Sequence, residues 1–178
     1  RYVVYNYLQD IWYYGTLSRS AWIDSDLREN PMAATYSNNL VNHEVGYDSQ
    51  EGAVASAITA TLLSSEFDLD DGDRFMFVNR VLPDVTFEGS TVTNPAAVMT
   101  LSPMQNSGSG YNNPLSVGGN SASTVTRTAT VPIEEFTGQV FVRLRGRQMA
   151  FKMESTELGV AWKLGIPRLE MRADGRRG

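Results

Sequence analysis

The sequence predicts an all-β protein, and three observations carry the prediction. Short runs of aromatic and β-branched residues alternate with turn residues along most of the 178 residues, a pattern that is typical of strands. In the C-terminal third the apolar residues recur with a period of two, so that Val140, Val142 and Leu144 share one face. No segment has the spacing of a convincing amphipathic helix, and the nearest, residues 53–63, is rich in Ser and Thr, which favours a strand.

Residues 1–52 are expected to be the last blade or blades of a propeller-like domain. Tyr, Trp and Asn are frequent in this stretch, and the turn residues predict two hairpins, at 3–15 and 32–47. A hairpin with Tyr on one strand and Trp on the next is similar to a β-propeller repeat, whose sheets need neighbours on both sides. Because one or two blades cannot close a ring, we expect the rest of the propeller to precede Arg1 in a longer chain.

Residues 53–178 are predicted to form an antiparallel β-sandwich. The expected strands cover residues 57–67, 74–82, 96–101, 124–131, 140–144, 149–153, 160–166 and 169–171. The acidic turn 68–73 is expected to join the strands 57–67 and 74–82 as a hairpin. Pro132 is expected to end the strand 124–131. The strands on either side of Gly146 are expected to pair with each other. Residues 102–123, between the expected strands 96–101 and 124–131, are predicted to be a long Ser, Gly and Asn loop, mobile or ordered by a partner.

The composition excludes several chemistries. The chain has no cysteine, so its residues supply no disulfide, thiolate nucleophile or cysteine-ligated zinc. Its only histidine, His43, is interpreted as a structural or surface residue. The cluster Asp68–Asp73 lacks the EF-hand spacing, because Gly72 is fifth and Asn79 twelfth, and it is interpreted as a solvated turn, with an opportunistic cation site as the alternative. The sequence therefore predicts no enzyme, no catalytic residue, no cofactor, no metal site and no membrane span.

The positive charge lies near the C-terminus. Residues 1–90 carry a net charge of −9 and residues 91–178 a net charge of +4. On a straight strand Arg143, Arg145 and Arg147 would share a face at intervals of about 6–7 Å, since the rise is ~3.3 Å per residue, and such a row is able to contact phosphates. The alternative is pairing with Glu154, Glu157 and Glu170 on neighbouring strands. The candidate DNA-channel or subunit-contact residues are Arg143, Arg145, Arg147, Arg168 and Arg172.

A resemblance to a known family is carried by two C-terminal runs, Gly146–Ser155 (GRQMAFKMES) and Leu158–Arg177 (LGVAWKLGIPRLEMRADGRR). They resemble the C-terminal ends of large virion proteins of tailed bacteriophages, in which a Gly-Arg-Gln strand pairs with a Trp-x-Leu-Gly-x-Pro-Arg strand and the chain ends in Asp-Gly-Arg-Arg. Residues Tyr2–Gly15, Trp22 and Pro31–Asn39 are similar to the last propeller blades of the same proteins. The middle of the chain matches in pattern more than in motif.

The resemblance is to the tail nozzle of short-tailed phages, also called tail tubular protein B, and to packaged-DNA stabilisation proteins. It implies a ring-forming homo-oligomer, expected to be a hexamer, below the portal and adaptor proteins in the virion tail, assembled in the host cytoplasm. The ring would form the distal DNA channel, retaining packaged DNA and conducting it at ejection. This hypothesis predicts that the indoles of Trp12 and Trp22 are buried, within blades or between them.

A carbohydrate-binding or carbohydrate-cleaving phage tail module is the alternative hypothesis. The run Trp12-Tyr13-Tyr14 would then stack on sugar rings, and a pair of carboxylates would hydrolyse the glycosidic bond. This hypothesis predicts that Trp12 or Trp22 is exposed in a groove beside two carboxylates.

Overall fold

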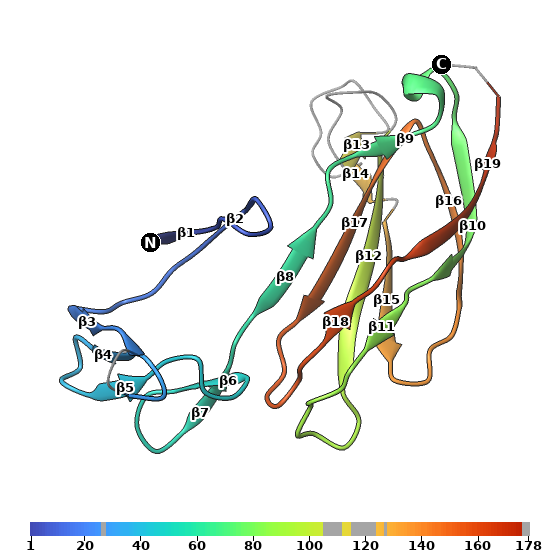
Figure 1. Cartoon of the computed structure of the whole chain (residues 1–178). Coiled ribbons are helices and arrows are strands. Elements are labelled where there is room, and N and C mark those ends of the chain that lie inside the picture. The colour runs from blue at the N-terminus through green and yellow to red at the C-terminus, as the bar shows by residue number, and fades with distance from the viewer. Residues whose placement is uncertain (26–27, 105–111, 115–123, 127, 176–178) are drawn as a thin grey trace. The chain divides into compact units, whose positions relative to one another are not determined.

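The computed structural model describes residues 1–25, 28–104, 112–114, 124–126 and 128–175 (Figure 1). The described part is all-β, as predicted, and contains no α-helix. It also contains no helix long and apolar enough to cross a membrane. The chain divides into two compact units, Arg1–Ser56 and Ala57–Gly178, whereas the sequence places the boundary after residue 52.

The first unit contains small separate sheets. Its strands are β1 (Tyr2–Asn6), β2 (Ile11–Gly15), β3 (Ala21–Ile23), β4 (Met32–Ala34), β5 (Leu40–Asn42), β6 (Asp48–Gln50) and β7 (Ala55–Ala57), the last of which ends across the unit boundary. The strands form the sheets β1-β2, β3-β4-β5 and β6-β7. The predicted first hairpin is confirmed, with Tyr5 opposite Trp12. No sheet in the described part closes on itself, so the propeller stays a prediction.

The predicted second hairpin is wrong in its return strand. The sequence suggests a return at 43–47, but β4 pairs with Leu40–Asn42. The chain reverses early because Asn38 adopts a left-handed conformation, with φ of 63°, which Asn tolerates better than most residues. The backbone N–H of Thr35 then donates to the carbonyl oxygen of Asn39 at 2.9 Å, which closes the turn.

The second unit contains two larger sheets. Its strands are β8 (Ala60–Leu63), β9 (Phe67–Asp68), β10 (Met76–Leu82), β11 (Val85–Thr86), β12 (Ala96–Met104), β13 (Asn112–Pro114), β14 (Thr124–Thr126), β15 (Ala129–Glu134), β16 (Val140–Gly146), β17 (Gln148–Ser155), β18 (Lys163–Leu164) and β19 (Arg168–Ala173). One sheet has the order β16-β10-β19, and the other has the order β15-β12-β17-β8 with β9 also paired to β17. Two further pairs, β11-β18 and β13-β14, complete the unit.

The predicted loop 102–123 is only partly a loop. Residues 102–104 belong to β12, and β13 pairs with β14, while residues 105–111 and 115–123 lie outside the described residues. Pro132 does not end the preceding strand, because it lies inside β15 opposite Val98. That position is compatible with proline because β15 is an edge strand, where one missing N–H donor is tolerated.

The expected pairing across Gly146 is wrong. β16 pairs with β10 in one sheet, whereas β17 pairs with β12, β8 and β9 in the other. The chain crosses between the sheets at Gly146 and Arg147, where the Arg147 backbone N–H donates to the carbonyl oxygen of Met104 at 2.8 Å. A period-two pattern indicates which face of a strand is buried, but it does not indicate which strand lies beside it.

The acidic turn is not a hairpin connection either, because β9 and β10 lie in different sheets. Residues Asp70–Gly72 form a short 3₁₀ turn, η2, in which Asp70 and Asp71 both have φ of 53°. Arg74 Nε lies 3.1 Å from Asp70 Oδ2, so the turn forms a local ion pair. The described part of the chain contains no group of three or more side chains placed to hold a metal ion.

One hydrophobic core joins the two larger sheets. It contains Met76, Val78 and Val81 of β10, Met99 and Leu101 of β12, Val140, Val142 and Leu144 of β16, and Met149, Phe151 and Met153 of β17. Burial of these side chains removes apolar surface from water, which is the main favourable contribution to folding. It also fixes the opposite side of β10, β16 and β19 as an outer face, because side chains alternate along a strand.

Candidate functional site: the arginine face

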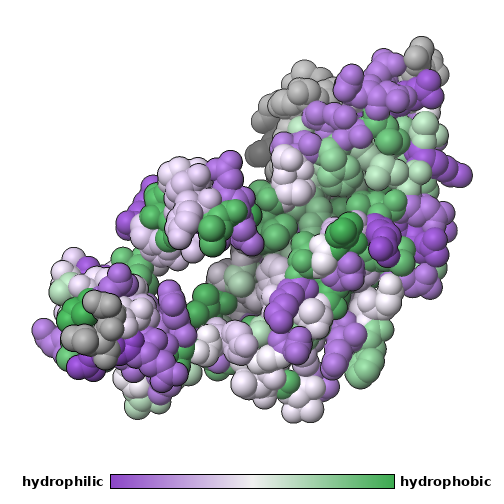
Figure 2. All heavy atoms as spheres, in the orientation of Figure 1, coloured by the Kyte–Doolittle hydropathy of each residue, from purple (hydrophilic) through white to green (hydrophobic). Residues whose placement is uncertain are grey.

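The predicted arginines lie on and beside the sheet β16-β10-β19. Arg143 and Arg145 belong to β16, Arg168 and Arg172 to β19, and Arg147 follows β16 directly. Their inward neighbours Leu144 and Met171 both oppose Val78 of β10, so Arg143, Arg145 and Arg172 point outward. Figure 2 shows hydrophilic residues gathered on the side of this unit where Figure 1 places β10, β16 and β19.

Register places arginines from both flanking strands beside Phe77, near one end of β10. Phe77 of β10 lies opposite Arg145 on one side and opposite Arg172 on the other. Leu82, at the far end of β10, lies opposite Arg168. We call the outward residues Phe77, Arg80, Phe141, Arg143, Arg168, Glu170 and Arg172 the arginine face.

Arg145 and Arg147 are engaged in contacts inside the unit. Their guanidinium carbons lie 3.9 Å and 4.6 Å from the centre of the Phe75 ring, a cation–π arrangement. Arg145 Nε also donates to Asp174 Oδ2 at 2.6 Å, and Arg147 Nη1 donates to the carbonyl oxygens of Gly72 and Asp73, each at 3.1 Å. These two arginines therefore hold the ends of the sheet together.

Two of the three expected glutamate partners, Glu154 and Glu170, pair elsewhere. Glu154 lies on β17 in the other sheet, where its carboxylate is 2.6 Å from Lys152 Nζ and accepts a hydrogen bond from Thr61. Glu170 lies 2.8 Å from Arg80 Nε and accepts a hydrogen bond from Asn79. The Asn79 amide, followed by the charge of Arg80, lowers the pKa of the Glu170 carboxyl, so this acid is already committed to partners on β10.

Arg143, Arg168 and Arg172 remain exposed. No ion pair with the described residues involves any of the three. Arg172 lies over the Phe77 ring, with its guanidinium carbon 4.9 Å from the ring centre. The face therefore presents three exposed cations without acidic partners in the described part of the chain, of which Arg172 lies over an aromatic ring.

A shallow hollow of about 190 Å³ lies on the arginine face beside Phe77. It is lined by Phe77, Asn79, Glu170, Met171 and Arg172. Its lining combines apolar with polar and charged residues, which suits an amphipathic side chain from a partner. Phe141 adds a second aromatic side chain to the face, and it is 72% exposed.

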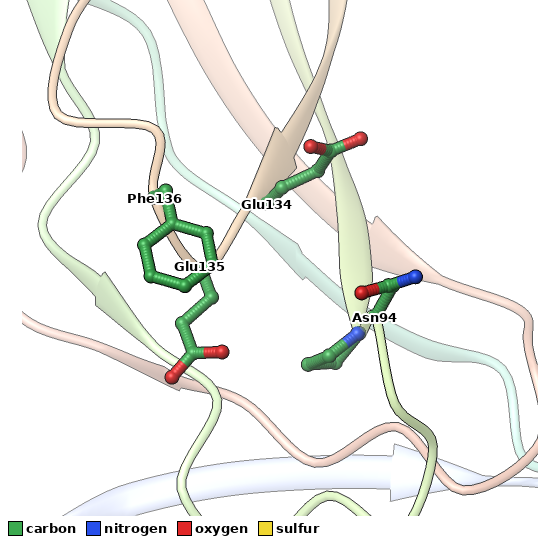
Figure 3. A pocket seen from close by; sticks show the side chains of 5 residues that line it. Asn94, Glu134, Glu135 and Phe136 are labelled. Atoms are coloured by element: carbon green, nitrogen blue, oxygen red, sulfur yellow. The ribbon is translucent and has the colours of Figure 1, made fainter.

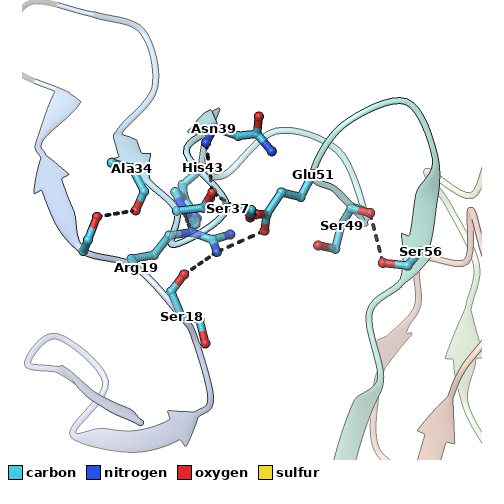
Figure 4. Close-up of polar contacts among 11 residues, drawn as sticks. Ser18, Arg19, Ala34, Ser37, Asn39, His43, Ser49, Glu51 and Ser56 are labelled. Carbon is cyan, nitrogen blue, oxygen red and sulfur yellow. Dashed lines mark hydrogen bonds and ion pairs between the residues drawn. The ribbon is translucent and has the colours of Figure 1, made fainter.

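A second polar cluster surrounds His43 in the first unit (Figure 4). Arg19 Nε donates to His43 Nε2 at 3.0 Å, and the imidazole packs on Trp22 with ring centres 4.5 Å apart. Arg19 also lies 3.6 Å from Glu51. Burial, followed by the charge of Arg19, lowers the pKa of His43, so this contact favours the neutral imidazole.

The expectation that both tryptophans are buried is wrong for the single chain. Trp12 is 66% exposed and Trp22 is 49% exposed, because small sheets leave both of their faces open. Trp12 stacks on Tyr5 with ring centres 4.4 Å apart. Neither tryptophan lines the hollow beside Phe77 or a second hollow, which is lined by Asn94, Pro95, Glu134, Glu135 and Phe136.

The arginine face could be predicted only in part. The sequence identifies the arginines, but it does not identify Phe75 and Asp174 as the partners that engage two of them, since both come from distant segments. Comparison with known proteins adds nothing further, because no family model matches the sequence and no curated protein is similar to it.

Proposed function

We propose that the chain is a structural subunit of a tailed-phage virion, a tail nozzle protein that forms part of the channel retaining and conducting DNA. The motifs between Gly146 and Arg177 support the proposal by resemblance. The all-β architecture agrees with it at the level of fold class. In this proposal residues 57–178 are a β-sandwich, and residues 1–56 complete a propeller-like domain with further sequence.

The mechanism is steric and electrostatic, without a chemical step. A ring of subunits surrounds the DNA, and the sign of the charge on its inner surface determines how strongly the phosphates are held. The chain has a net charge of −5, which favours a channel wall along which DNA slides. The arginine face then lies away from the lumen, where it contacts another subunit.

The arginine face is the observation that carries this proposal. Three exposed arginines from two strands lie on one face, and none of them forms an ion pair with the described residues. A surface of this kind gains stability when a partner with complementary charge covers it. In a ring-forming subunit that partner is a neighbouring protein, either a second copy or an adaptor protein.

Copy number in purified particles tests the proposal. Quantitative mass spectrometry of virions that contain the chain should give six copies per particle, in a fixed ratio to the portal protein. Absence from the virion, or the hundreds of copies expected of a capsid protein, would contradict a nozzle.

A second candidate function is carbohydrate binding, and one observation favours it. Trp12 is exposed and fixed in place by Tyr5, whose hydroxyl donates to Asp10 Oδ1 at 2.8 Å, so a rigid aromatic surface faces solvent. Glycan-array binding that is lost in Trp12→Ala and kept in Tyr7→Ala would support this function. Tyr7 is a suitable control because it is 78% exposed on the turn that follows β1.

A further inference from the structure

The turn between β15 and β16 presents an exposed aromatic ring between two carboxylates. We call Glu134, Glu135 and Phe136 the acidic tip. Phe136 is 92% exposed. The turn is nevertheless closed by two hydrogen bonds, because the Thr137 backbone N–H donates to the Glu134 carbonyl oxygen at 3.0 Å and the Glu134 backbone N–H donates to Thr137 Oγ1 at 3.0 Å. The tip therefore holds its ring in water on a fixed backbone.

Figure 3 shows the Phe136 ring between the two glutamates, whose carboxylates point away from each other. A hollow of about 260 Å³ lies beside the tip and is lined by Asn94, Pro95 and the three tip residues. No ion pair within the described residues involves Glu134 or Glu135. The tip thus combines one apolar group with two carboxylates that are available for cations.

The arginine face has the complementary chemistry. Its exposed cations are Arg143, Arg168 and Arg172, and its hollow of about 190 Å³ is lined by Phe77 and by one of these cations, Arg172. A cavity of about 150 Å³ accommodates a benzene ring, so the hollow is large enough for one phenyl side chain. A ring entering it would contact Phe77 and the Arg172 guanidinium that lies over the Phe77 ring, while the flanking carboxylates would meet guanidinium groups.

Each copy of the chain carries one tip and one face on different surfaces. The tip precedes β16, whose first residue Val140 opposes Val81 near one end of β10, whereas the hollow is lined by Phe77 near the other end of β10. The two hydrogen bonds of the turn fix its local backbone. A contact between two different surfaces leaves one tip and one face free at the ends of every dimer, so such contacts propagate, and they form a closed ring when the rotation between copies allows it.

We propose that the acidic tip of one copy docks on the arginine face of the next, with Phe136 in the hollow beside Phe77 and Glu134 and Glu135 paired with exposed arginines. The inference rests on the proposed function, because it names the contact that builds the ring. The proposed partner of the arginine face is a second copy of the chain. Binding of DNA or of an adaptor protein to that face is the alternative result that the experiments below would detect.

The absence of cysteine from the chain makes cross-linking a direct test. In the full chain, Glu135→Cys combined with Arg172→Cys should form intermolecular disulfides under mild oxidation and give a ladder of covalent species that ends at the ring size. The control pair Glu157→Cys with Arg172→Cys uses another exposed glutamate and should give only background. A ladder no stronger than the control would overturn the inference, and a product that stops at dimers would exclude a propagating contact.

Charge reversal supplies a second measurement. Glu135→Arg and Arg172→Glu should each weaken self-association in sedimentation experiments about tenfold, and their combination should restore it. Phe136→Ala should weaken self-association as well, whereas Tyr36→Ala, at a residue 74% exposed in the first unit, should not. Unchanged association in the tip and face variants would overturn the interface.

The two proposals fail in different ways. A ring in the virion that persists in all tip and face variants would leave the nozzle intact and remove this contact. Disulfide ladders from a chain that is absent from virions would keep the contact and remove the nozzle. Loss of DNA binding in Arg172→Glu, with self-association unchanged, would assign the face to DNA and overturn the inference.

Discussion

Substitution of Gly146 tests how the chain crosses between the two sheets and positions the arginines. A Cβ added at Gly146 would lie 2.9 Å from the carbonyl oxygens of Gln148 and Met104 and 2.9 Å from Pro103 Cβ. Two of these atoms belong to the backbone and the third to a proline ring, so none can move aside easily. Gly146→Ala must therefore displace a strand of one of the sheets.

The expected magnitude follows from two opposing effects. Overpacking of this kind costs about 1–3 kcal/mol, while the loss of glycine's freedom in the unfolded chain stabilises by about 0.4–1 kcal/mol. Gly138→Ala is the matched control, because a Cβ there has no atom within 4 Å and the backbone does not have a positive φ. The unfolded-state effect is common to both variants, so Gly146→Ala should be less stable than Gly138→Ala by about 1–3 kcal/mol.

Urea unfolding followed by tryptophan fluorescence measures this difference. The background Trp12→Phe/Trp22→Phe leaves Trp162, which packs partly against the core, as the reporter for residues 57–178. The free energies of unfolding of the two alanine variants are compared in that background. Equal stability of the two variants would refute the close crossing at Gly146, and with it the different sheet assignments of β16 and β17.

Other predictions concern titration and packing. The pKa of His43, the only histidine, should lie below its ordinary value of 6.5 when measured by NMR, because of burial and the charge of Arg19. The unfolded chain then binds more protons than the folded chain, so the first unit loses stability as the pH falls below 6.5. Arg19→Met should raise the pKa of His43. Met153→Ala, at a fully buried side chain, should cost about 2–5 kcal/mol in urea unfolding. Arg145→Gln should lower the free energy of unfolding by about 1 kcal/mol, since the ion pair of Arg145 with Asp174 is half exposed. A larger loss would contradict the description of this ion pair as a half-exposed contact.

Strand positions in the second unit could be predicted because apolar residues alternate with polar ones on half-buried sheets. Residues 140–144 and 149–153 are strands for that reason. Their partners could not be predicted, because alternation carries no information on which strand lies beside which. A short connection favours a hairpin, but the chain passes into the opposite sheet at Gly146, where two backbone carbonyls approach closely.

In the candidate site, too, the sequence predicts which side chains share a face but not which residues they contact. Residue types point to the arginines, because a strand places every second side chain on one face. The distinction between Arg145, which is held by Asp174 and Phe75, and Arg172, which lies exposed over Phe77, depends on contacts between distant segments. The acidic tip was missed because a Glu-Glu-Phe turn looks like any solvated connection until the exposure of its ring is known.

Cryo-electron microscopy of the intact particle that contains this chain tests the central claim most directly. We predict a ring of density for the chain on the DNA path beneath the portal, with the face formed by Arg143, Arg168 and Arg172 at the boundary between subunits. Density in a peripheral fibre or spike, away from the DNA path, would contradict the nozzle and favour carbohydrate binding.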